Sequence, residues 1–510
     1  MPSSVWEIVD ANASERAIGA PGRAWLDGAG LRALVRDVLG TLDGVGIGRG
    51  DRVGLVLPNG PEAATGFVAL ACACTAAPLN PAYKAEEFEF YLSDLKPKAV
   101  VLLDADPTPA RDVAARLGIP VLALHPQADG PAGLFRLDAS ALPPAAAATP
   151  GPAGAEDPAL VLHTSGTTAR PKIVPLTGGN LAASARHIAA TLALSPSDVC
   201  LNVMPLFHIH GLVAAVLSSL HAGAGVCCTP GFNAFKFGGW LREVRPSWYT
   251  AVPTMHQAVL MRMRAQAEAA RAAGLRFIRS SSASLPPQVM AELEEVFGAP
   301  VIESYGMTEA AHQMASNPLP PRPRKPGAVG LAAGPEMAVL GEDGTVLPQG
   351  AVGEVAIRGP NVTPGYDNNP DANARAFTAG WFRTGDEGRF DEDGYLSLTG
   401  RLKEQINRGG EKISPLEVDV VLLDHPGVAQ AVTFAIPHDT LGEEVGAAVV
   451  PREGQRVTER EVRDFAAARL AAFKVPRRVL VMDDIPKGAT GKVQRIGLAQ
   501  KLGLGGPGAS

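Results

Sequence analysis

Residues 164–172, TSGTTARPK, place hydroxyls, a glycine and one lysine between an apolar run and a helical pattern. Hydroxyls, main-chain N–H groups and a point charge are the groups that a loop needs to hold a polyphosphate. The loop does not match the Walker pattern GxxxxGK(S/T), because Pro171 precedes Lys172 and Ile173 follows it. Its composition therefore predicts a phosphate-binding loop, and its pattern excludes an ordinary P-loop ATPase.

Three further motifs carry complementary chemistry. YGMTE offers Glu309 as a hard oxygen ligand for Mg²⁺ and Thr308 as a hydroxyl for a phosphate. GWFRTGD ends in Asp386, a carboxylate that can accept hydrogen bonds from ribose hydroxyls beside Arg401. PKGATGK ends in Lys492, a lysine near the end of the chain. Each motif alone is a weak signal, but the four together predict a nucleotide site.

The elements that would position these motifs follow an α/β pattern, in which short apolar runs alternate with longer helical patterns up to about residue 301. Strands are expected at 53–57, 99–104, 121–125, 159–163, 199–204, 248–252, 277–280 and 301–304. Helices are expected at 61–77, 181–194, 254–273 and 286–297. This alternation predicts βαβ units and parallel sheets, on which ligands bind at the carboxyl ends of the strands.

The pattern of apolar and polar residues changes in the later parts of the chain. Residues 336–398 form short strand-like runs with glycine turns, which indicates a β-rich subdomain. The region after residue 401 returns to an α+β pattern, with strands expected at 428–435, 446–451 and 479–482 and a helix at 458–472. Residues 139–158 are rich in proline and alanine, and are expected to form an extended surface connection.

The composition excludes several classes of protein. The 510 residues are 46% hydrophobic and carry a net charge of -6, so the chain can bury a large core and has no basic footprint for nucleic acid. The most apolar stretch, residues 211–228, is broken by glycine and falls short of the ~20 residues of a membrane span. Five cysteines without CxxC spacing are expected to be small buried hydrophobes in a reducing, cytoplasmic protein.

Together, the four motifs resemble those of the adenylate-forming superfamily, which includes acyl- and aryl-CoA synthetases, luciferases and the adenylation domains of peptide synthetases. The resemblance runs from residue 53 to residue 495. It implies an α/β fold with a large N-terminal domain of stacked βαβ-type sheets, a β-rich subdomain, and a small mobile α+β C-terminal domain. It places the N-terminal AMP-binding domain at residues 1–402, with the β-rich part at about 336–400, and the C-terminal domain at residues 403–510.

The resemblance also implies a reaction and its participants. A carboxylate attacks the α-phosphorus of ATP and pyrophosphate leaves, after which the thiol of CoA displaces AMP from the acyl-adenylate. ATP and CoA are co-substrates, Mg²⁺ is the cofactor, and the C-terminal domain rotates between the two steps.

Residue roles carry over from the matching motifs. The nucleotide is held by Thr164, Ser165, Gly166, Thr167, Thr168, Lys172, Tyr305, Gly306, Thr308, Asp386, Arg401 and Lys492. The catalytic residues are Lys172, Thr308, Lys492 and Glu309, the last of which also binds the metal. Lys403 is the hinge, and the CoA channel is lined by Gly409, Gly410, Glu411 and Lys412.

The acid is expected to be short and polar. The segments PLFHIHG, SSSASLPP and YGMTEAAHQMASNPLPP resemble those of oxalate–CoA ligases, and their candidate acid-binding residues are His208, His210, Ser282 and His312. Malonate or another short acid is the nearest competitor, although no arginine sits in YGMTEAAHQM to meet a distal carboxylate. The nucleotide motifs would also suit an acyl-AMP ligase that loads a carrier protein. A catalytically silent nucleotide-binding regulator is a further possibility, but it would be expected to lose Lys492 or Glu309.

Overall fold

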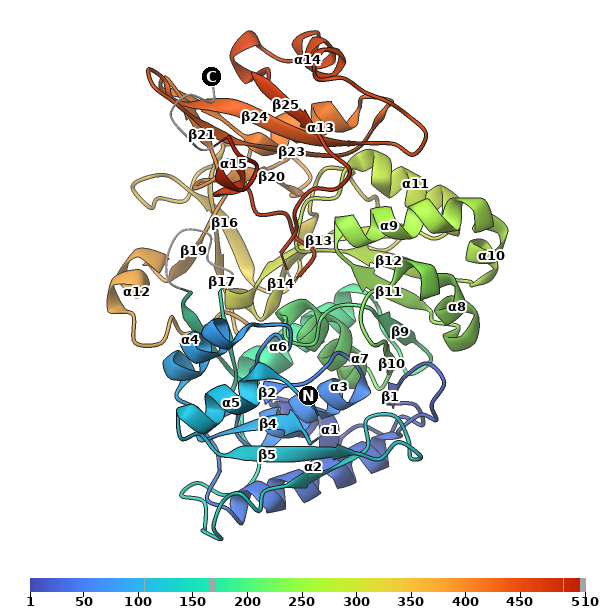
Figure 1. The fold of residues 1–510 in the computed structure, drawn as a ribbon, viewed down its shortest axis with the longest axis vertical. Coiled ribbons are helices and arrows are strands. Elements are labelled where there is room, and N and C mark those ends of the chain that lie inside the picture. The colour runs from blue at the N-terminus through green and yellow to red at the C-terminus, as the bar shows by residue number, and fades with distance from the viewer. Residues whose placement is uncertain (105, 165–170, 489, 505–510) are drawn as a thin grey trace.

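Two β-sheets and the helices packed against them form the N-terminal part of the structure (Figure 1). The computed structural model describes the chain apart from residues 105, 165–170, 489 and 505–510. The first sheet is parallel at its centre and antiparallel at both edges, in the order β6-β5-β4-β2-β3-β7-β8. Its strands are β2 (Arg52–Val56), β3 (Thr75–Pro78), β4 (Ala99–Leu103), β5 (Val121–Pro126), β6 (Phe135–Asp138), β7 (Pro158–His163) and β8 (Ile173–Thr177).

The second sheet runs in the order β1-β10-β9-β11-β12-β13-β14-β15. It is parallel from β1 to β13, and its last two pairings are antiparallel. The carboxyl ends of β9, β11, β12 and β13 therefore lie side by side, which is where a ligand is expected on such a sheet. Its strands are β1 (Ile18–Gly19), β9 (Val199–Asn202), β10 (Gly225–Cys228), β11 (Trp248–Ala251), β12 (Phe277–Ser280), β13 (Val301–Met307), β14 (His312–Ser316) and β15 (Leu331–Ala332).

Helices lie between the two sheets and on their outer faces. Both α3 and α6 contact strands of the two sheets, so they form the central layer. That layer comprises α1 (Val5–Asp10), α2 (Gly28–Asp43), α3 (Pro61–Ala73), α6 (Gly178–Thr191), the π-helix η1 (His210–Leu217) and α7 (Ser218–His221). The outer helices are α4 (Ala85–Leu95) and α5 (Pro109–Arg116) on the first sheet, and α8 (Ala234–Val244), α9 (Pro253–Met263), η2 (Arg264–Gln266), α10 (Ala267–Ala272) and α11 (Pro287–Phe297) on the second.

A small antiparallel sheet and a C-terminal α+β unit complete the fold, with the C-terminal unit at the top of Figure 1. The small sheet comprises β16 (Glu336–Leu340), β17 (Gly353–Arg358), β18 (Phe377–Thr378), β19 (Trp381–Phe390) and β20 (Leu396–Arg401), with α12 (Pro370–Ala376) inserted between β17 and β18. The C-terminal unit comprises β21 (Ile406–Arg408), β22 (Glu411–Ile413), α13 (Pro415–Leu423), β23 (Val428–His438), β24 (Gly442–Pro451), α14 (Glu459–Ala467), η4 (Ala472–Lys474), β25 (Arg478–Val481) and α15 (Leu498–Lys501).

The observed elements confirm the predicted α/β class, and each expected strand overlaps an observed one. Three of the expected helices are too long. The helix expected at 61–77 ends at Ala73, because Cys74 has an extended φ of -153° and β3 begins directly after it. This alanine-rich strand is buried on both faces between β2 and β7, so its small apolar residues give no alternating pattern. The helix expected at 254–273 is interrupted by η2, and the one expected at 458–472 ends with α14.

The proline- and alanine-rich segment 139–158 connects β6 to β7 through turns and bends, and it is more than the surface connection that was expected. Ala147 and Ala153 are buried. The Ala153 N–H donates to the Cys72 carbonyl near the end of α3 at 2.7 Å, so the segment is fastened to the central layer.

Two features of the structure bear on the cysteines and on the apolar stretches of the sequence. All five cysteines are buried and free, as expected of small hydrophobes. No helix among the residues that the structure describes is long and apolar enough to cross a membrane.

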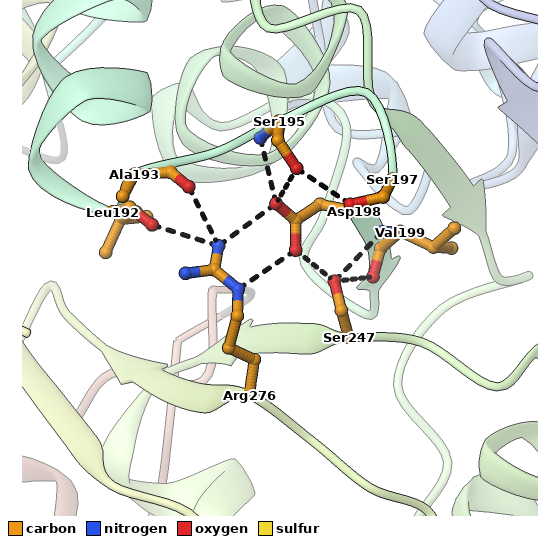
Figure 2. Close-up of polar contacts among 8 residues, drawn as sticks. All are labelled: Leu192, Ala193, Ser195, Ser197, Asp198, Val199, Ser247 and Arg276. Atoms are coloured by element: carbon orange, nitrogen blue, oxygen red, sulfur yellow. Dashed lines mark hydrogen bonds and ion pairs between the residues drawn. The ribbon is translucent and has the colours of Figure 1, made fainter.

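A closed polar cluster fastens the amino end of the second sheet (Figure 2). The Asp198 carboxylate, next to β9, accepts from the Ser195 N–H at 2.9 Å, the Ser247 hydroxyl at 2.7 Å and the Arg276 guanidinium at 3.1 Å. Arg276 also donates to two carbonyls just after α6. Burial acts to raise the pKa of Asp198, but the hydrogen bonds from Ser247, Ser195 and Arg276 lower it overall. Arg276 is thus an arginine whose charge is matched by the fold itself.

Candidate active site

Thr164 and Lys172 close the base of the predicted phosphate loop. The Thr164 N–H donates to the Lys172 carbonyl at 2.9 Å, and the Lys172 N–H donates to the Thr164 hydroxyl at 3.1 Å. These bonds join the end of β7 to the start of β8, its antiparallel neighbour. The remaining candidates of this loop, Ser165, Gly166, Thr167 and Thr168, lie outside the described residues.

Lys172 and Glu309 both contact Tyr366, a residue that no sequence motif marks. The Lys172 ammonium lies 4.1 Å from the centroid of the Tyr366 ring. The Tyr366 hydroxyl donates to Glu309 Oε1 at 2.9 Å. Glu309 lies in the short helix η3 (Thr308–Ala310), and burial raises the pKa of its carboxyl group. Two charged motif residues that are far apart in the sequence are therefore joined by one tyrosine.

Asp386 brings together the residues expected to hold the nucleoside. Its carboxylate is 5% exposed and accepts from the Tyr305 hydroxyl and, at 3.0 Å, from Arg401 Nε. Asp386 and Arg401 are paired across β19 and β20, so the sheet register fixes their separation. Tyr305 lies on β13, so this contact joins the small sheet to the second sheet.

Lys492 reaches the same region from the C-terminal unit. The dark-red segment after β25 runs down toward β13 and α9 in Figure 1. There, the Thr254 hydroxyl at the start of α9 donates to the Gly491 carbonyl at 2.7 Å. Burial and the nearby Arg401 lower the pKa of Lys492 to about 8, while Asp386 and Glu309 act in the opposite direction. The lysine is therefore close to the charged groups of both N-terminal motifs.

The C-terminal unit makes further contacts with the outer helices of the second sheet. Gln257 of α9 donates to the Ala429 carbonyl at 3.3 Å. Arg452 lies 3.3 Å from Glu292 of α11, measured between its guanidinium nitrogen and a carboxylate oxygen. These contacts and the hydrogen bond from Thr254 hold the C-terminal unit in an arrangement that presents Lys492 to the site.

The four acid-binding candidates lie together. His210 Nδ1 is 3.1 Å from the Ser282 hydroxyl, and the rings of His210 and His312 are 4.9 Å apart between centroids. His208 Nδ1 accepts from the His210 N–H at 3.3 Å. Burial lowers the pKa of all three histidines, that of His208 to about 3, and the charge of Lys492 contributes to each shift. The histidines are therefore neutral at physiological pH.

Arg279 is a cation in contact with this cluster, and it belongs to none of the predicted site motifs. The side chain is fully buried on β12, and its neighbours are the neutral groups of His210, Thr250, His312 and Gln313 at 3.3–3.5 Å. No carboxylate among the described residues pairs with it, and its Nε has no hydrogen-bond partner. Burial lowers the pKa of Arg279 to about 9, so it remains protonated at neutral pH. The sequence does contain one signal, since an arginine inside the apolar strand FIRS is unusual.

The backbone around this cluster is unusual in several places. Ser282 and His312 have positive φ values of 74° and 101°, which non-glycine residues adopt at a cost of about 1–3 kcal/mol. A Cβ on Gly306 would lie 1.8 Å from the His312 carbonyl oxygen, so only glycine fits there. His210 begins the π-helix η1, a form that is frequent at functional sites. The strained backbone at Ser282 and His312 therefore costs free energy of folding, and it sets the positions of their side chains.

The CoA and hinge candidates lie outside this cluster. Gly409 and Gly410 form the exposed turn between β21 and β22, and Glu411 and Lys412 are the exposed first residues of β22. Gly409 and Gly410 have positive φ values of 60° and 99°, as this turn requires. Lys403 is exposed in the turn after β20.

Arg495 connects that turn to the segment that carries Lys492. Its guanidinium donates to Glu404 at 3.2 Å and also to Asp419 of α13. The hinge turn, α13 and the segment of Lys492 thereby share one charged contact.

Two protein-family models match most of the chain. The family model for AMP-binding enzymes matches residues 6–367, and the family model for their C-terminal domain matches residues 417–492. The chain belongs to the AMP-binding enzyme family. This membership confirms the adenylate-forming fold that the four motifs predicted.

Individual members of the AMP-binding family resemble the chain along nearly its whole length. Oxalate–CoA ligase of Arabidopsis thaliana is 50% identical over 491 residues, which cover 95% of this chain and 95% of the relative. Oxalate–CoA ligase of Saccharomyces cerevisiae is 42% identical and covers 89% and 87%, respectively. The crystal structure of ATP-bound MatB from Rhodopseudomonas palustris superimposes with a TM-score of 0.87 at 32% identity, covering 98% of this chain and 99% of MatB.

These findings also confirm the enzyme class. The chain is an AMP-forming acid–CoA ligase of the acyl-CoA synthetase type, with ATP, CoA and a carboxylate as substrates. The roles of individual residues remain predictions, as does the domain boundary at Lys403.

Proposed function

We propose that this enzyme activates a short carboxylic acid with a second anionic group, and that the acid is oxalate. The observation that carries the proposal is Arg279, a fully buried cation without an acidic partner among the described residues. A buried charge is costly until a group of opposite charge pairs with it. The second carboxylate of a dicarboxylate would provide that charge and accept hydrogen bonds in place of the long contacts to neutral groups.

The size and polarity of the surroundings favour the smallest dicarboxylate. His210 and His312 are next to Arg279, and both are neutral, so they can donate hydrogen bonds without adding charge. The side chain of Ser282 faces His210 from the loop after β12. A long or apolar acyl chain would have to be buried against these polar groups, at a cost for each unpaired one. The two relatives named oxalate–CoA ligase support the same choice.

In the first step, we assign charge neutralisation to the two lysines. The acid's reacting carboxylate and the α-phosphate of ATP are both anionic, so they repel each other as they approach. Lys492 from the C-terminal unit neutralises charge at the α-phosphate, and Lys172 neutralises charge on the departing pyrophosphate. Thr308 donates a hydrogen bond to the α-phosphate. Asp386 and Arg401 hold the ribose hydroxyls, and Tyr305 and Gly306 contact adenine.

Glu309 is the residue we assign to Mg²⁺. Among the described residues, no group of three or more His, Cys, Asp or Glu side chains could hold a metal ion. Mg²⁺ usually binds through one or two carboxylates and the phosphates of its substrate, so one buried carboxylate beside the phosphate loop fits a metal ion that enters with ATP. When bound, Mg²⁺ supplies positive charge that stabilises the phosphoryl transition state.

The second step needs a different arrangement of the C-terminal unit. In the present arrangement, Lys492 lies in the site and the hairpin of Gly409, Gly410, Glu411 and Lys412 is exposed to solvent. We assign the hinge to Lys403 and the pantetheine channel to this hairpin after rotation. The CoA thiolate would then attack the acyl carbonyl, form the thioester bond, and release AMP with the acyl C–O bond electrons.

A substrate panel tests the assignment of the acid. We expect pyrophosphate release with C2 to C6 mono- and dicarboxylates to be greatest with oxalate, and AMP release to require free CoA. His312→Ala and Ser282→Ala are expected to raise the KM for oxalate strongly and leave that for ATP nearly unchanged. A preference for malonate would keep the role of Arg279 and change the acid, whereas a preference for monocarboxylates would contradict the proposal. AMP release only with a phosphopantetheine-bearing protein would identify a carrier-loading ligase instead.

A further inference from the structure

Tyr366 holds two charged side chains apart. It is buried in the connection between β17 and α12, with the Lys172 ammonium over its ring at 4.1 Å and Glu309 Oε1 at 2.9 Å from its hydroxyl. The structure records no direct ion pair between these two described residues. The ring thus stabilises the lysine through a cation–π contact, and the hydroxyl binds the carboxylate at its other end.

The main chain around Tyr366 is fastened to the same two elements. The Thr363 N–H donates to the Glu309 carbonyl at 2.7 Å, and the Thr363 hydroxyl donates to the Pro175 carbonyl of β8 at 2.7 Å. The Asp367 N–H donates to the Ile173 carbonyl, also of β8, at 3.0 Å. Residues 363–367 therefore bridge β8, which follows the phosphate loop, and η3, which carries Glu309. These hydrogen bonds fix the main chain from which the Tyr366 side chain projects.

The position of Tyr366 has a chemical consequence. Glu309 is buried and Lys172 is partly buried, so the two charges would attract each other, and a direct pair would have to separate before either could bind a nucleotide or its metal. Tyr366 satisfies each group separately: the ring face attracts the ammonium without neutralising it, and the hydroxyl occupies one carboxylate oxygen. Lys172 keeps its charge for a phosphate, and Glu309 keeps an oriented carboxylate for a cation.

We propose that Tyr366 is a positioning residue that keeps Lys172 and Glu309 separate and oriented for the metal-bound nucleotide. The inference rests on the proposed role of Glu309 toward Mg²⁺, but it does not depend on which acid the enzyme uses. The hydroxyl acts on the carboxylate and the ring acts on the lysine. The two parts of the side chain are therefore expected to have separable effects.

The test is ATP binding measured by calorimetry, with Mg²⁺ and with EDTA, in the absence of acid and CoA. Tyr366→Phe keeps the ring and removes the hydroxyl. We expect it to raise the Kd for ATP about tenfold when Mg²⁺ is present and less than twofold when the metal is removed, since a hydrogen bond to a charged group is lost. Tyr366→Leu also removes the ring, so it is expected to weaken ATP binding in both conditions.

A matched control is available in Tyr395. Lys325 lies 4.5 Å from the centroid of its ring, and its hydroxyl donates to the Pro323 carbonyl, so it has the same kinds of contact away from the site. Tyr395→Phe is expected to leave both Kd values unchanged. In a Glu309→Gln background, Tyr366→Phe should have no further metal-dependent effect, because the two residues act as a unit.

Equal weakening with and without Mg²⁺ in Tyr366→Phe, or a full metal-dependent effect in the Glu309→Gln background, would overturn the inference. Because no acid is present in these measurements, failure of the oxalate assignment would leave their outcome unaffected. Thermal unfolding of each variant detects a fold defect, and the ratio of the two Kd values remains interpretable because a folding defect affects both.

Discussion

Replacing Arg279 by methionine should improve the stability of the enzyme and impair its use of oxalate. Methionine is unbranched, uncharged and shorter than arginine, so Arg279→Met removes the buried cation while keeping an apolar chain in most of its place. Burial lowers the pKa of Arg279 from 12.5 to about 9, which at about 1.36 kcal/mol per pKa unit is roughly 5 kcal/mol against the charged form in the folded state. The four long contacts to neutral groups offset part of this cost. We therefore expect the free energy of unfolding to rise by about 1–4 kcal/mol.

The effect on catalysis has the opposite sign. Without Arg279, the second carboxylate of oxalate would be buried among neutral groups, and breaking a buried charged pair costs about 3–5 kcal/mol. This corresponds to a decrease of about 10²-fold to several thousandfold in kcat/KM for oxalate, since about 1.4 kcal/mol is tenfold. The KM for ATP should remain nearly constant. Pyrophosphate release gives kcat/KM for oxalate and for acetate in each variant. Because acetate lacks the second carboxylate, its kcat/KM should change little or not at all in Arg279→Met.

Arg276, directly before β12, provides the matched control. It lies three positions before Arg279, but its charge is paired with Asp198 (Figure 2). Arg276→Met should therefore lower the Tm and leave the ratio of oxalate to acetate activity unchanged. The reasoning would be refuted if Arg279→Met lowered the Tm as Arg276→Met does, or if it kept the kcat/KM for oxalate within about threefold of the unmodified enzyme.

Three further predictions concern the nucleotide and acid sites. Lys492→Ala should slow adenylate formation by about 10²–10³-fold, as for loss of one preorganised charge, and largely spare thiolation of a presynthesised acyl-adenylate; equal losses in both half-reactions would contradict this division. Because the pKa of Lys492 is lowered to about 8 and its protonated form is the active one, kcat/KM for adenylate formation should fall as pH rises through about 8; a profile that stays flat to about pH 9.5 would disagree. Gly306→Ala should lower the Tm and raise the KM for oxalate together, because its Cβ would displace the main chain of His312; a variant with an unchanged Tm and KM would be inconsistent with the 1.8 Å approach.

Local patterns predict the architecture well where each strand is a continuous apolar run between helices. β2, β4 and β7 are predictable because their Val and Leu residues stand out from the flanking polar segments. β3 is not, because its Thr-Ala-Ala-Pro sequence continues the small apolar residues of α3. Only its register between β2 and β7 shows that these residues are in a strand, and register is a long-range property that no local pattern contains.

Some residues of the candidate site can also be predicted from local patterns, and others cannot. Glu309, Asp386 and Lys492 lie in motifs whose residue types indicate their chemistry, and the structure brings them to one region. Arg279 and Tyr366 lie outside these motifs, and the one sequence signal at Arg279 is its charge within an apolar strand. That signal does not show that the neighbours of Arg279 are neutral, and the role of Tyr366 becomes visible only when β8 and η3 are seen to lie on either side of it. Both depend on packing between distant segments, which sequence spacing does not encode.

The contact of Arg495 with Glu404 and Asp419 has a mechanical consequence. Arg495 is three residues from Lys492, Glu404 follows the predicted hinge, and Asp419 lies in the helix after the hairpin that is predicted to bind CoA. Because the Arg495 guanidinium contacts both Glu404 and Asp419, the segment of Lys492 and the hairpin would rotate together as one rigid body. Withdrawal of Lys492 and arrival of the hairpin would then be one event, so the two half-reactions would exclude each other in time. An enzyme built in this way would not expose its acyl-adenylate to CoA before pyrophosphate formation is complete.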